Sequence, residues 1–254
     1  GYGAGLLMLG GGITDMTLLV LAGGVVALLF GLLTAPLLAS YRGIFFATLT
    51  LALSMLMHGA LTKADFLGGS DGLNLHSPTL FGMRPASAAE AVYMLYLFSS
   101  VLVVVVAVAC RLHFDSLRGL LSLATRDNEI RVEYLGASVS RVISENFIAA
   151  AFLGGVGGAL NAIAVRHIDP ELAFWTTSGE FVFVAILSGY LSVGAVFASS
   201  ILLELIRSFS SQYFPNAWQM SLGIFMLASI LFLPNGIGGL IVRRKERDSE
   251  KDPA

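Results

Sequence analysis

One polar stretch decides the organisation of this chain: Arg111-Leu-His-Phe-Asp-Ser-Leu-Arg-Gly-Leu-Leu-Ser-Leu-Ala-Thr-Arg-Asp-Asn-Glu-Ile-Arg-Val-Glu-Tyr-Leu-Gly-Ala-Ser-Val-Ser-Arg141. It holds five arginines and four acids and lies between two long apolar segments, in a chain whose charged fraction is only 13%. Within it, residues 125–136 predict a short helix. Thr125 or Asp127 can cap its start, and Gly136 suits the left-handed conformation after a last turn. A capped, charged helix between two membrane-length segments indicates a part that contacts another protein.

The composition is that of a polytopic membrane protein. The hydrophobic fraction is 56% and the chain holds 28 glycines, with a mean hydropathy of +0.81. These values favour an all-α membrane fold over a soluble domain. The net charge of -2 does not indicate nucleic-acid binding, because the charges are confined to loops and the tail. Cys110 is the single cysteine, so the chain cannot form an internal disulfide or a cysteine metal cluster.

Apolar runs of membrane length follow one another along the chain. We expect about six membrane segments, in residues 16–39, 44–62, 88–110, 142–165, 181–206 and 217–242. The turn Tyr41-Arg-Gly43 joins the first two and predicts an antiparallel hairpin. Ser188-Gly189 and Gly194 interrupt the fifth, which is therefore expected to be broken or re-entrant. Residues 3–13 are too short to span the membrane. At the start of the third segment, Ser87-Ala-Ala-Glu90 has the spacing of a capping box.

The basic residues predict which side of the membrane each connection faces. By the positive-inside rule, Arg42, the central arginines and Arg243-Arg-Lys245 are all cytoplasmic. Three complete spans between Arg141 and Arg243 would place the tail on the opposite side. If the fifth segment enters and leaves the membrane on the same face, the tail lies on the same side as the central arginines. Irregular backbone at membrane depth occurs where protein or a water-filled cavity lines it, so a re-entrant segment would lie beside a pathway.

Two glycine-rich stretches are candidates for contacts. Gly154 and Gly158 have the small-xxx-small spacing that lets another helix approach closely, and the alternative is a flexible hinge. In the polar interruption 63–85, Asp71 and Asn74 lie in a turn sequence. This loop is either a plain surface loop or a contact surface for a soluble binding protein.

The chain has no recognisable catalytic chemistry. No stretch matches the phosphate-binding pattern, and no nucleophile elbow is present, so we assign no catalytic residue and no cofactor, and we expect no enzyme. The histidines show no metal-ligand spacing, at His58, His76, His113 and His167. Glu145 and Glu204 lie nearest to the membrane interior. Either structural pairing or a proton pathway would explain them, and their roles stay open.

Four stretches together resemble one family, the LivM/LivH permeases of branched-chain amino acid ABC importers. They are Tyr41-Arg-Gly-Ile-Phe-Phe-Ala-Thr-Leu-Thr-Leu-Ala52, Gly68-Gly-Ser-Asp-Gly72, Asp127-Asn-Glu-Ile-Arg-Val-Glu-Tyr-Leu-Gly136 and Phe232-Leu-Pro-Asn-Gly-Ile-Gly-Gly-Leu240. The resemblance runs from about Gly3 to Val242. It implies a permease domain in residues 1–242, with a cytoplasmic coupling loop at 111–141 and a cytoplasmic tail at 243–254. It also implies further spans before the position of Gly1.

The resemblance implies partners and site residues as well. The importer would contain a homologous permease subunit, two cytoplasmic ATPases that hold ATP and Mg, and a periplasmic substrate-binding protein, in the lipid of a bacterial cytoplasmic membrane. The residues implied in ATPase coupling are Arg126, Asp127, Asn128, Glu129, Arg131, Glu133 and Gly136. Those implied along the pathway and gate are Ser188, Gly189, Ser192, Gly154, Gly158 and Asn161. Asp71 and Asn74 are the implied contacts to the binding protein.

The expected function is therefore a transmembrane permease subunit that moves branched-chain amino acids or a similar small polar solute into the cytoplasm. The segment Ser188-Gly-Tyr-Leu-Ser192 departs from the family pattern because it lacks two glycines. The solute, including urea or an aromatic acid, and the pairing of like or unlike permeases stay open. Two alternatives remain: an ion-coupled secondary transporter that uses Glu145 and Glu204, and a structural membrane subunit without a polar pathway.

Overall fold

The chain is helical and forms two compact units. The structure, a computed structural model, describes residues 1–189, 192–213, 218–232 and 236–239. The units are Gly1–Trp175 and Thr176–Ala254. Within the described residues, six helices are long and apolar enough to cross a membrane. The predicted all-α polytopic membrane fold is thereby confirmed.

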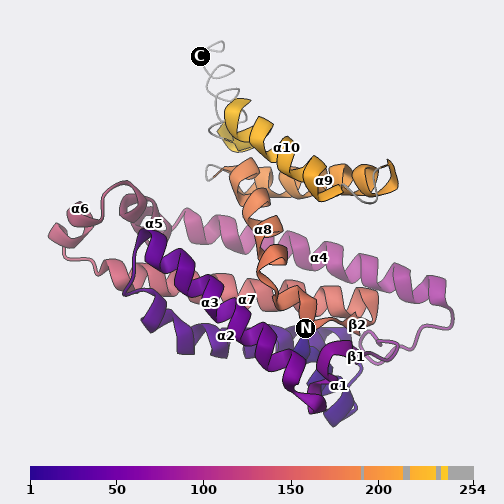
Figure 1. Cartoon of the computed structure of the whole chain (residues 1–254). Coiled ribbons are helices and arrows are strands. Elements are labelled where there is room, and N and C mark those ends of the chain that lie inside the picture. The colour runs from indigo at the N-terminus through magenta and orange to yellow at the C-terminus, as the bar shows by residue number, and fades with distance from the viewer. Residues whose placement is uncertain (190–191, 214–217, 233–235, 240–254) are drawn as a thin grey trace, which may run out of the picture. The chain divides into compact units, whose positions relative to one another are not determined.

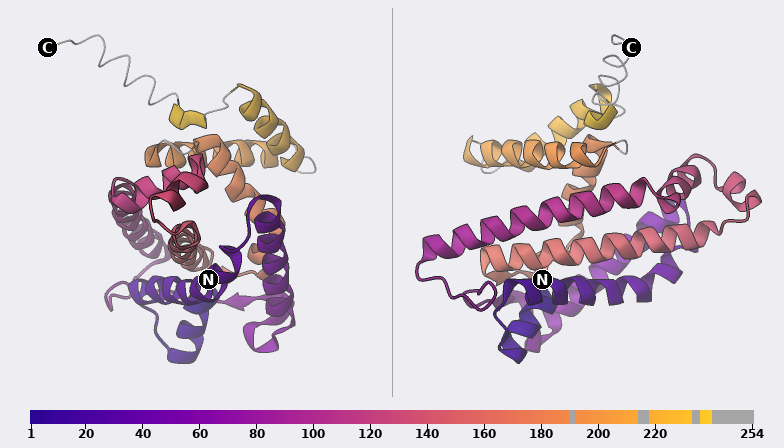
Figure 2. Two further views of the ribbon diagram at one scale, coloured as in Figure 1. Left: turned by 90° about the vertical axis from the view of Figure 1, so that its left-hand side faces the viewer. Right: turned by 180° about the vertical axis from the view of Figure 1, so that it is seen from behind.

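The first unit contains seven α-helices, a two-stranded sheet and three short 3-10 helices (Figure 1). The α-helices are α1 Tyr2–Gly11, α2 Met16–Leu38, α3 Gly43–Lys63, α4 Ala88–Phe114, α5 Leu117–Asp127, α6 Glu129–Tyr134 and α7 Val139–Val165. The shorter elements are η1 Asp65–Leu67, η2 Gly69–Asp71, β1 Leu73–Asn74, β2 His167–Ile168 and η3 Pro170–Ala173. Figure 2 shows α2, α4 and α7 running side by side.

The core of this unit is the contact between α2 and α7, which is close because glycines line it. A methyl group on Gly155 of α7 would lie 2.5 Å from the carbonyl oxygen of Gly23 on α2. A methyl group on Gly31 would lie 2.7 Å from the Cβ of Ala151. Missing side chains at these positions let two helix backbones approach, as in membrane helix pairs generally. The buried cluster around this contact includes Met16, Leu19, Val156, Ala159 and Ile163.

Within the described residues of this chain, the close contact between α2 and α7 is made one position along from the predicted Gly154. A methyl group on Gly154 would meet no atom within 4 Å, whereas Gly155 faces α2. The close-packed row is therefore Ala151, Gly155 and Ala159. Adjacent residues of an α-helix lie about 100° apart around its axis, so a glycine-rich stretch alone does not reveal which of its glycines faces a neighbour. A methyl group added to Gly158 would lie 3.2 Å from the backbone nitrogen of Gly1.

The predicted hairpin packing of α2 and α3 is also wrong. Helix α3 has no buried residue, and α2 packs mainly on α7 and contacts α3 only sparsely. A short connection brings two helix ends together, but complementary faces decide which helices pack along their length. The far end of α3 instead lies against the short helices η2 and η3. The Ser54 hydroxyl donates to the carbonyl oxygen of Ala173 at 2.7 Å, and His58 Nδ1 lies 3.1 Å from that of Pro170.

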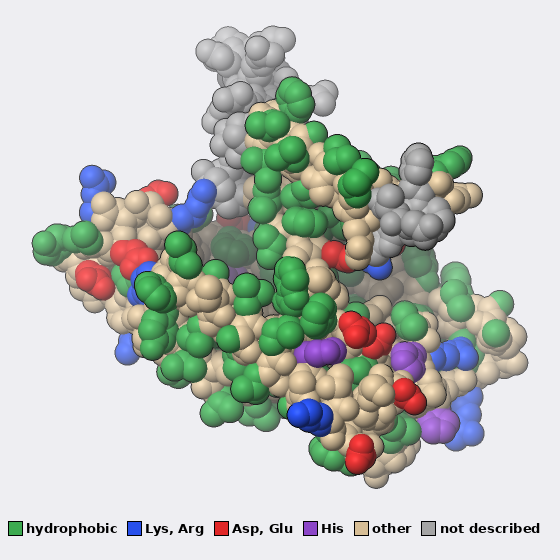
Figure 3. Space-filling model, viewed as in Figure 1, with side chains coloured by type: hydrophobic (Ala, Val, Ile, Leu, Met, Phe, Trp, Pro, Cys, Tyr) green, Lys and Arg blue, Asp and Glu red, His purple; other side chains and the backbone are tan. Residues whose placement is uncertain are grey.

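Exposed apolar side chains cover the middle of the first unit. Figure 3 shows hydrophobic side chains over this region, with acidic and basic side chains towards the two ends. Leu56 on α3 is 67% exposed, and Val101 and Val104 on α4 are 64% and 62% exposed. Such surfaces are too large for a soluble monomer and suit a hydrocarbon environment.

The start of α4 confirms the predicted capping box. The Ser87 hydroxyl accepts a hydrogen bond from the Glu90 backbone N–H at 3.2 Å. The Glu90 carboxylate accepts one from the backbone N–H of Ala86 at 2.7 Å. In the usual capping box, the glutamate side chain accepts from the backbone N–H of the cap residue. Here it accepts from the N–H of the preceding residue instead. Glu90 thus has a structural role at a helix start.

The second unit contains the interrupted segment. Its helices are α8 Trp175–Ser188, which begins at the last residue of the first unit, α9 Val193–Tyr213 and α10 Trp218–Phe232. The predicted interruption after Ser188 is present, while Gly194 lies inside the first turn of α9. Residues 233–235 of the closing motif, the end of the predicted sixth segment at 240–242 and the tail at 243–254 lie outside the described residues.

Candidate functional site

The central polar stretch folds into two helices, α5 and α6, separated by Asn128. The hydroxyl of Thr125 donates to the carbonyl oxygen of Leu121 at 2.8 Å, so Thr125 lies within α5 and caps nothing. Asn128 has an extended backbone, and its side-chain oxygen accepts the Arg131 N–H at 3.0 Å. The prediction that Thr125 or Asp127 caps the helix is therefore wrong, and Asn128 is the cap. A side-chain amide and a carboxylate serve this position equally well, so the sequence could not separate them.

The end of α6 is closed by the predicted glycine. Gly136 has φ of +85°, and its N–H donates to the carbonyl oxygen of Glu133 at 2.9 Å. The N–H of Ala137 donates to that of Val132 at 3.2 Å. These two bonds form a Schellman motif, for which glycine is preferred because it lacks a Cβ. Val132 is 1% exposed and anchors the helix to the unit.

Arg42 connects α6 to the start of α3 and to α7. Its Nε donates to the Glu129 carboxylate at 2.9 Å, and its Nη2 donates to the Ser140 hydroxyl at 3.5 Å. The two members of the ion pair are 36% and 43% exposed. The α2–α3 connection therefore lies at the same end of the unit as α6, in agreement with the common sidedness predicted for their arginines. The cytoplasmic assignment of that end stays a prediction.

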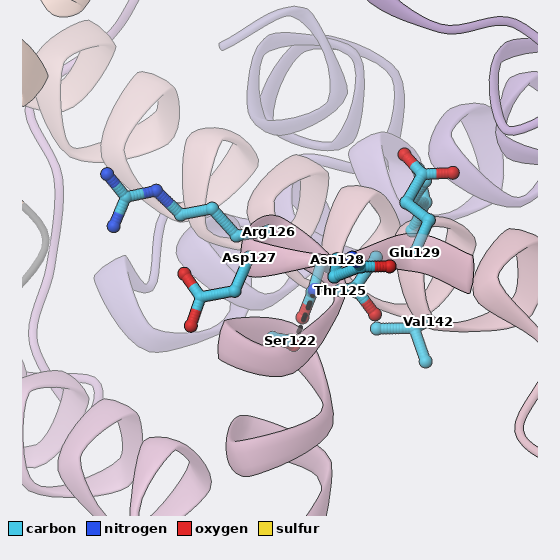
Figure 4. A pocket seen from close by; sticks show the side chains of 9 residues that line it. Ser122, Thr125, Arg126, Asp127, Asn128, Glu129 and Val142 are labelled. Carbon is cyan, nitrogen blue, oxygen red and sulfur yellow. Dashed lines mark hydrogen bonds between the residues drawn. The ribbon is translucent and has the colours of Figure 1, made fainter. Parts of the chain in front are cut away.

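A polar groove of about 370 Å³ lies between α5, α6 and α7. Its lining residues are Ser122, Thr125, Arg126, Asp127, Asn128, Glu129, Val142, Ile143 and Asn146. In Figure 4, Arg126 and Asp127 extend from one part of this ribbon segment, and Glu129 extends from its other part, away from them. The Asn146 amide donates to the Ser122 hydroxyl at 2.7 Å and joins α7 to α5.

Glu145 is paired at the same end. Its carboxylate lies 3.9 Å from Nε of Arg118, and the two side chains are 41% and 72% exposed. This contact agrees with the structural pairing considered for Glu145. Glu204 lies on α9 in the second unit and is exposed.

Among the predicted coupling residues, Asn128 is the cap of α6 and Glu129 is the half-buried partner of Arg42. The exposed members are Arg126, Asp127, Asn128, Arg131, Glu133 and Gly136. The sequence analysis missed the apolar face of α6, where Ile130 and Tyr134 are 63% and 87% exposed. Their spacing of four residues, which places two side chains on one helix face, was the available signal.

The predicted pathway residues are divided between the two units. Gly154 and Asn161 lie on the exposed side of α7, and Gly158 is half-buried. In the second unit, Ser188 is 1% exposed and Ser192 precedes α9. The structure brings the interruption together with the closing glycines. A methyl group on Gly236, which has φ of +66°, would lie 2.5 Å from the nitrogen of Gly189, and one on Gly238 would lie 2.9 Å from the Ser188 carbonyl oxygen.

The predicted binding-protein contacts lie at the end of the first unit away from α6. There β1 pairs antiparallel with β2, with Asn74 opposite His167. The side-chain oxygen of Asn74 lies 2.9 Å from His167 Nδ1, so this side chain is engaged within the chain. Asp71 is exposed. Their contact with another protein stays a prediction. Among the residues that the structure describes, no group of histidine, cysteine and acidic side chains could hold a metal ion.

Comparison with known proteins identifies the family. The family model described as "Branched-chain amino acid transport system / permease component" matches residues 1–232. This is most of the chain. The chain belongs to this permease family. The predicted resemblance is confirmed, and the permease is a multi-pass membrane protein.

Two curated relatives of the permease carry the name "High-affinity branched-chain amino acid transport system permease protein LivM". One is from Escherichia coli (strain K12) and one from Salmonella typhimurium (strain LT2). Each is 27% identical over 218 residues, which cover 77% of this chain and 51% of the relative. The chain thus spans about half the length of these curated relatives. No solved structure gives a significant match.

Proposed function

We propose that this permease is a transmembrane subunit of an ATP-binding-cassette importer in a bacterial cytoplasmic membrane. It moves branched-chain amino acids or a similar small polar solute into the cytoplasm. A homologous permease subunit completes the pathway, and a periplasmic binding protein delivers the solute. Two cytoplasmic ATPases bind ATP and Mg and supply the energy. Family membership and the shape of the α5–α6 end support this proposal.

The observation that carries the proposal is the presentation of α6. A six-residue helix is too short to be stable in isolation. Here a side-chain cap, a Schellman motif and one buried valine hold it in place. Ile130 and Tyr134 then project from it into the surroundings. An exposed aromatic and an aliphatic side chain on a preorganised helix are typical of an interface hot spot. This arrangement suits docking into a groove of an ATPase.

The test is retention of the ATPase by variants of two exposed aromatic residues. Tyr134→Asp places a charge on α6, and Phe66→Asp places one at the far end of the unit, where Phe66 is 78% exposed. We expect Tyr134→Asp to weaken retention of the ATPase chains during purification by about 2 kcal/mol, or roughly 30-fold. Phe66→Asp should retain them as the unaltered permease does. Equal retention by the two variants, or an unaltered permease that retains no ATPase, would count against the proposal.

A further inference from the structure

Arg42 lies where three helices of the first unit meet. Its Nε donates to Glu129 of α6 at 2.9 Å, and its Nη2 donates to Ser140 of α7 at 3.5 Å. Its Nη1 donates to the carbonyl oxygens of Ala39 and Tyr41, just beyond the end of α2. A guanidinium presents five donors in a planar fork and can hold several acceptors at once. Arg42 therefore links α6 to the ends of both α2 and α7.

Helices α2 and α7 behave as one body at this end. The Ser140 hydroxyl also donates to the Ala39 carbonyl oxygen at 3.4 Å. Farther along, the backbones meet through Gly23, Gly31 and Gly155. Close-packed interiors transmit displacement because they have no free volume to absorb it. A force applied through the hydrogen bonds of Arg42 at the end of α2 and the start of α7 is therefore transmitted along both helices.

We propose that Arg42 is a positioning residue that carries a displacement of α6 to the α2–α7 pair. The proposal rests on the proposed function, in which an ATPase moves α6. The Arg42–Glu129 ion pair is the joint: Glu129 is the first residue of α6, and Arg42 precedes the first residue of α3. This ion pair joins the Tyr41-Arg-Gly motif to the Asn-Glu-Ile-Arg motif, whose paired side chains are 87 residues apart in the sequence.

The test measures movement at the far end of α7. Val165 is the last residue of α7 and is 63% exposed, so a cysteine there reports movement through its rate of reaction with a water-soluble maleimide. Cys110→Ala removes the single native cysteine. In the transporter purified with its partner chains, we expect ATP to change the labelling rate of Val165→Cys. Adding Arg42→Gln should reduce this change by about two- to fivefold, the scale of a half-exposed ion pair, while the ATPase remains bound and active.

Two further variants separate a joint from a general structural role. Glu129→Gln should reduce the ATP-dependent change as Arg42→Gln does, and Arg42→Lys should restore it only in part because an ammonium cannot hold all the acceptors. Arg118→Gln removes the neighbouring Arg118–Glu145 pair and should leave the change intact. The proposed joint is overturned if Arg42→Gln leaves the ATP-dependent change in labelling rate intact. It is also overturned if the permease with Arg42 intact shows no such change while the ATPase is bound, or if Arg42→Gln lowers the change only in proportion to a loss of ATPase activity. A permease that binds no ATPase overturns the proposed function itself.

Discussion

Replacing Gly155 with alanine tests whether α2 and α7 pack through their glycines. The added methyl group would lie 2.5 Å from both the Gly23 carbonyl oxygen and the Ala27 Cβ. Carbon atoms in contact prefer about 3.5–4.0 Å, so the two helices must separate by roughly 1 Å. Neither obstacle is the flexible end of a long side chain. The strain therefore spreads along the interface.

Gly154→Ala is the matched control, because nothing lies within 4 Å of its added methyl group. Both variants gain the same helix propensity, about 1 kcal/mol for alanine over glycine. This gain cancels when the two are compared. The difference that remains is the cost of overpacking, about 1–3 kcal/mol. Gly154→Ala should be as stable as the unaltered permease or slightly more so, and Gly155→Ala should be less stable.

The assay is the apparent melting temperature of the purified, detergent-solubilised chain, read as loss of the monodisperse peak after heating. A difference of about 2 kcal/mol corresponds to roughly 4–8 °C for a protein of this size. We expect Gly155→Ala to melt below Gly154→Ala by that interval. Equal melting temperatures, or a lower one for Gly154→Ala, would refute the assigned register of α7 against α2.

Two further substitutions probe glycines at positive φ. Gly236→Ala should destabilise the second unit by about 1–3 kcal/mol, because its methyl group would lie 2.5 Å from the Gly189 nitrogen; melting temperature measures this. Gly223→Ala, with nothing within 4 Å, is the control and should not lower it. Gly136→Ala should cost about 1 kcal/mol, because φ is +85° although the space around it is open. Faster amide exchange at Ala137 would reveal the weakened Schellman motif, and unchanged exchange would contradict the assignment.

Patterns that depend on neighbouring residues in the sequence were predictable. The apolar segments, the Ser87 cap, the glycine end of α6 and the interruption after Ser188 all follow from local rules on hydrophobic length, capping and left-handed backbone. The coupling segment was found in the same way, because charge stands out in an apolar chain. Its cap was missed since three neighbouring polar residues could each fill that position.

The sequence by itself determined which stretches are apolar helices of membrane length and that the chain lies in a membrane, because these properties are set by composition and by local hydrophobic pattern. Only the tertiary structure decided which faces meet. It placed Gly155 rather than Gly154 against α2 and Glu129 beside Arg42, and it put Gly236 against the backbone at Gly189. Such pairings depend on the rotation of each helix about its axis and on residues far apart in the chain. Packing settles both, and no local pattern encodes them.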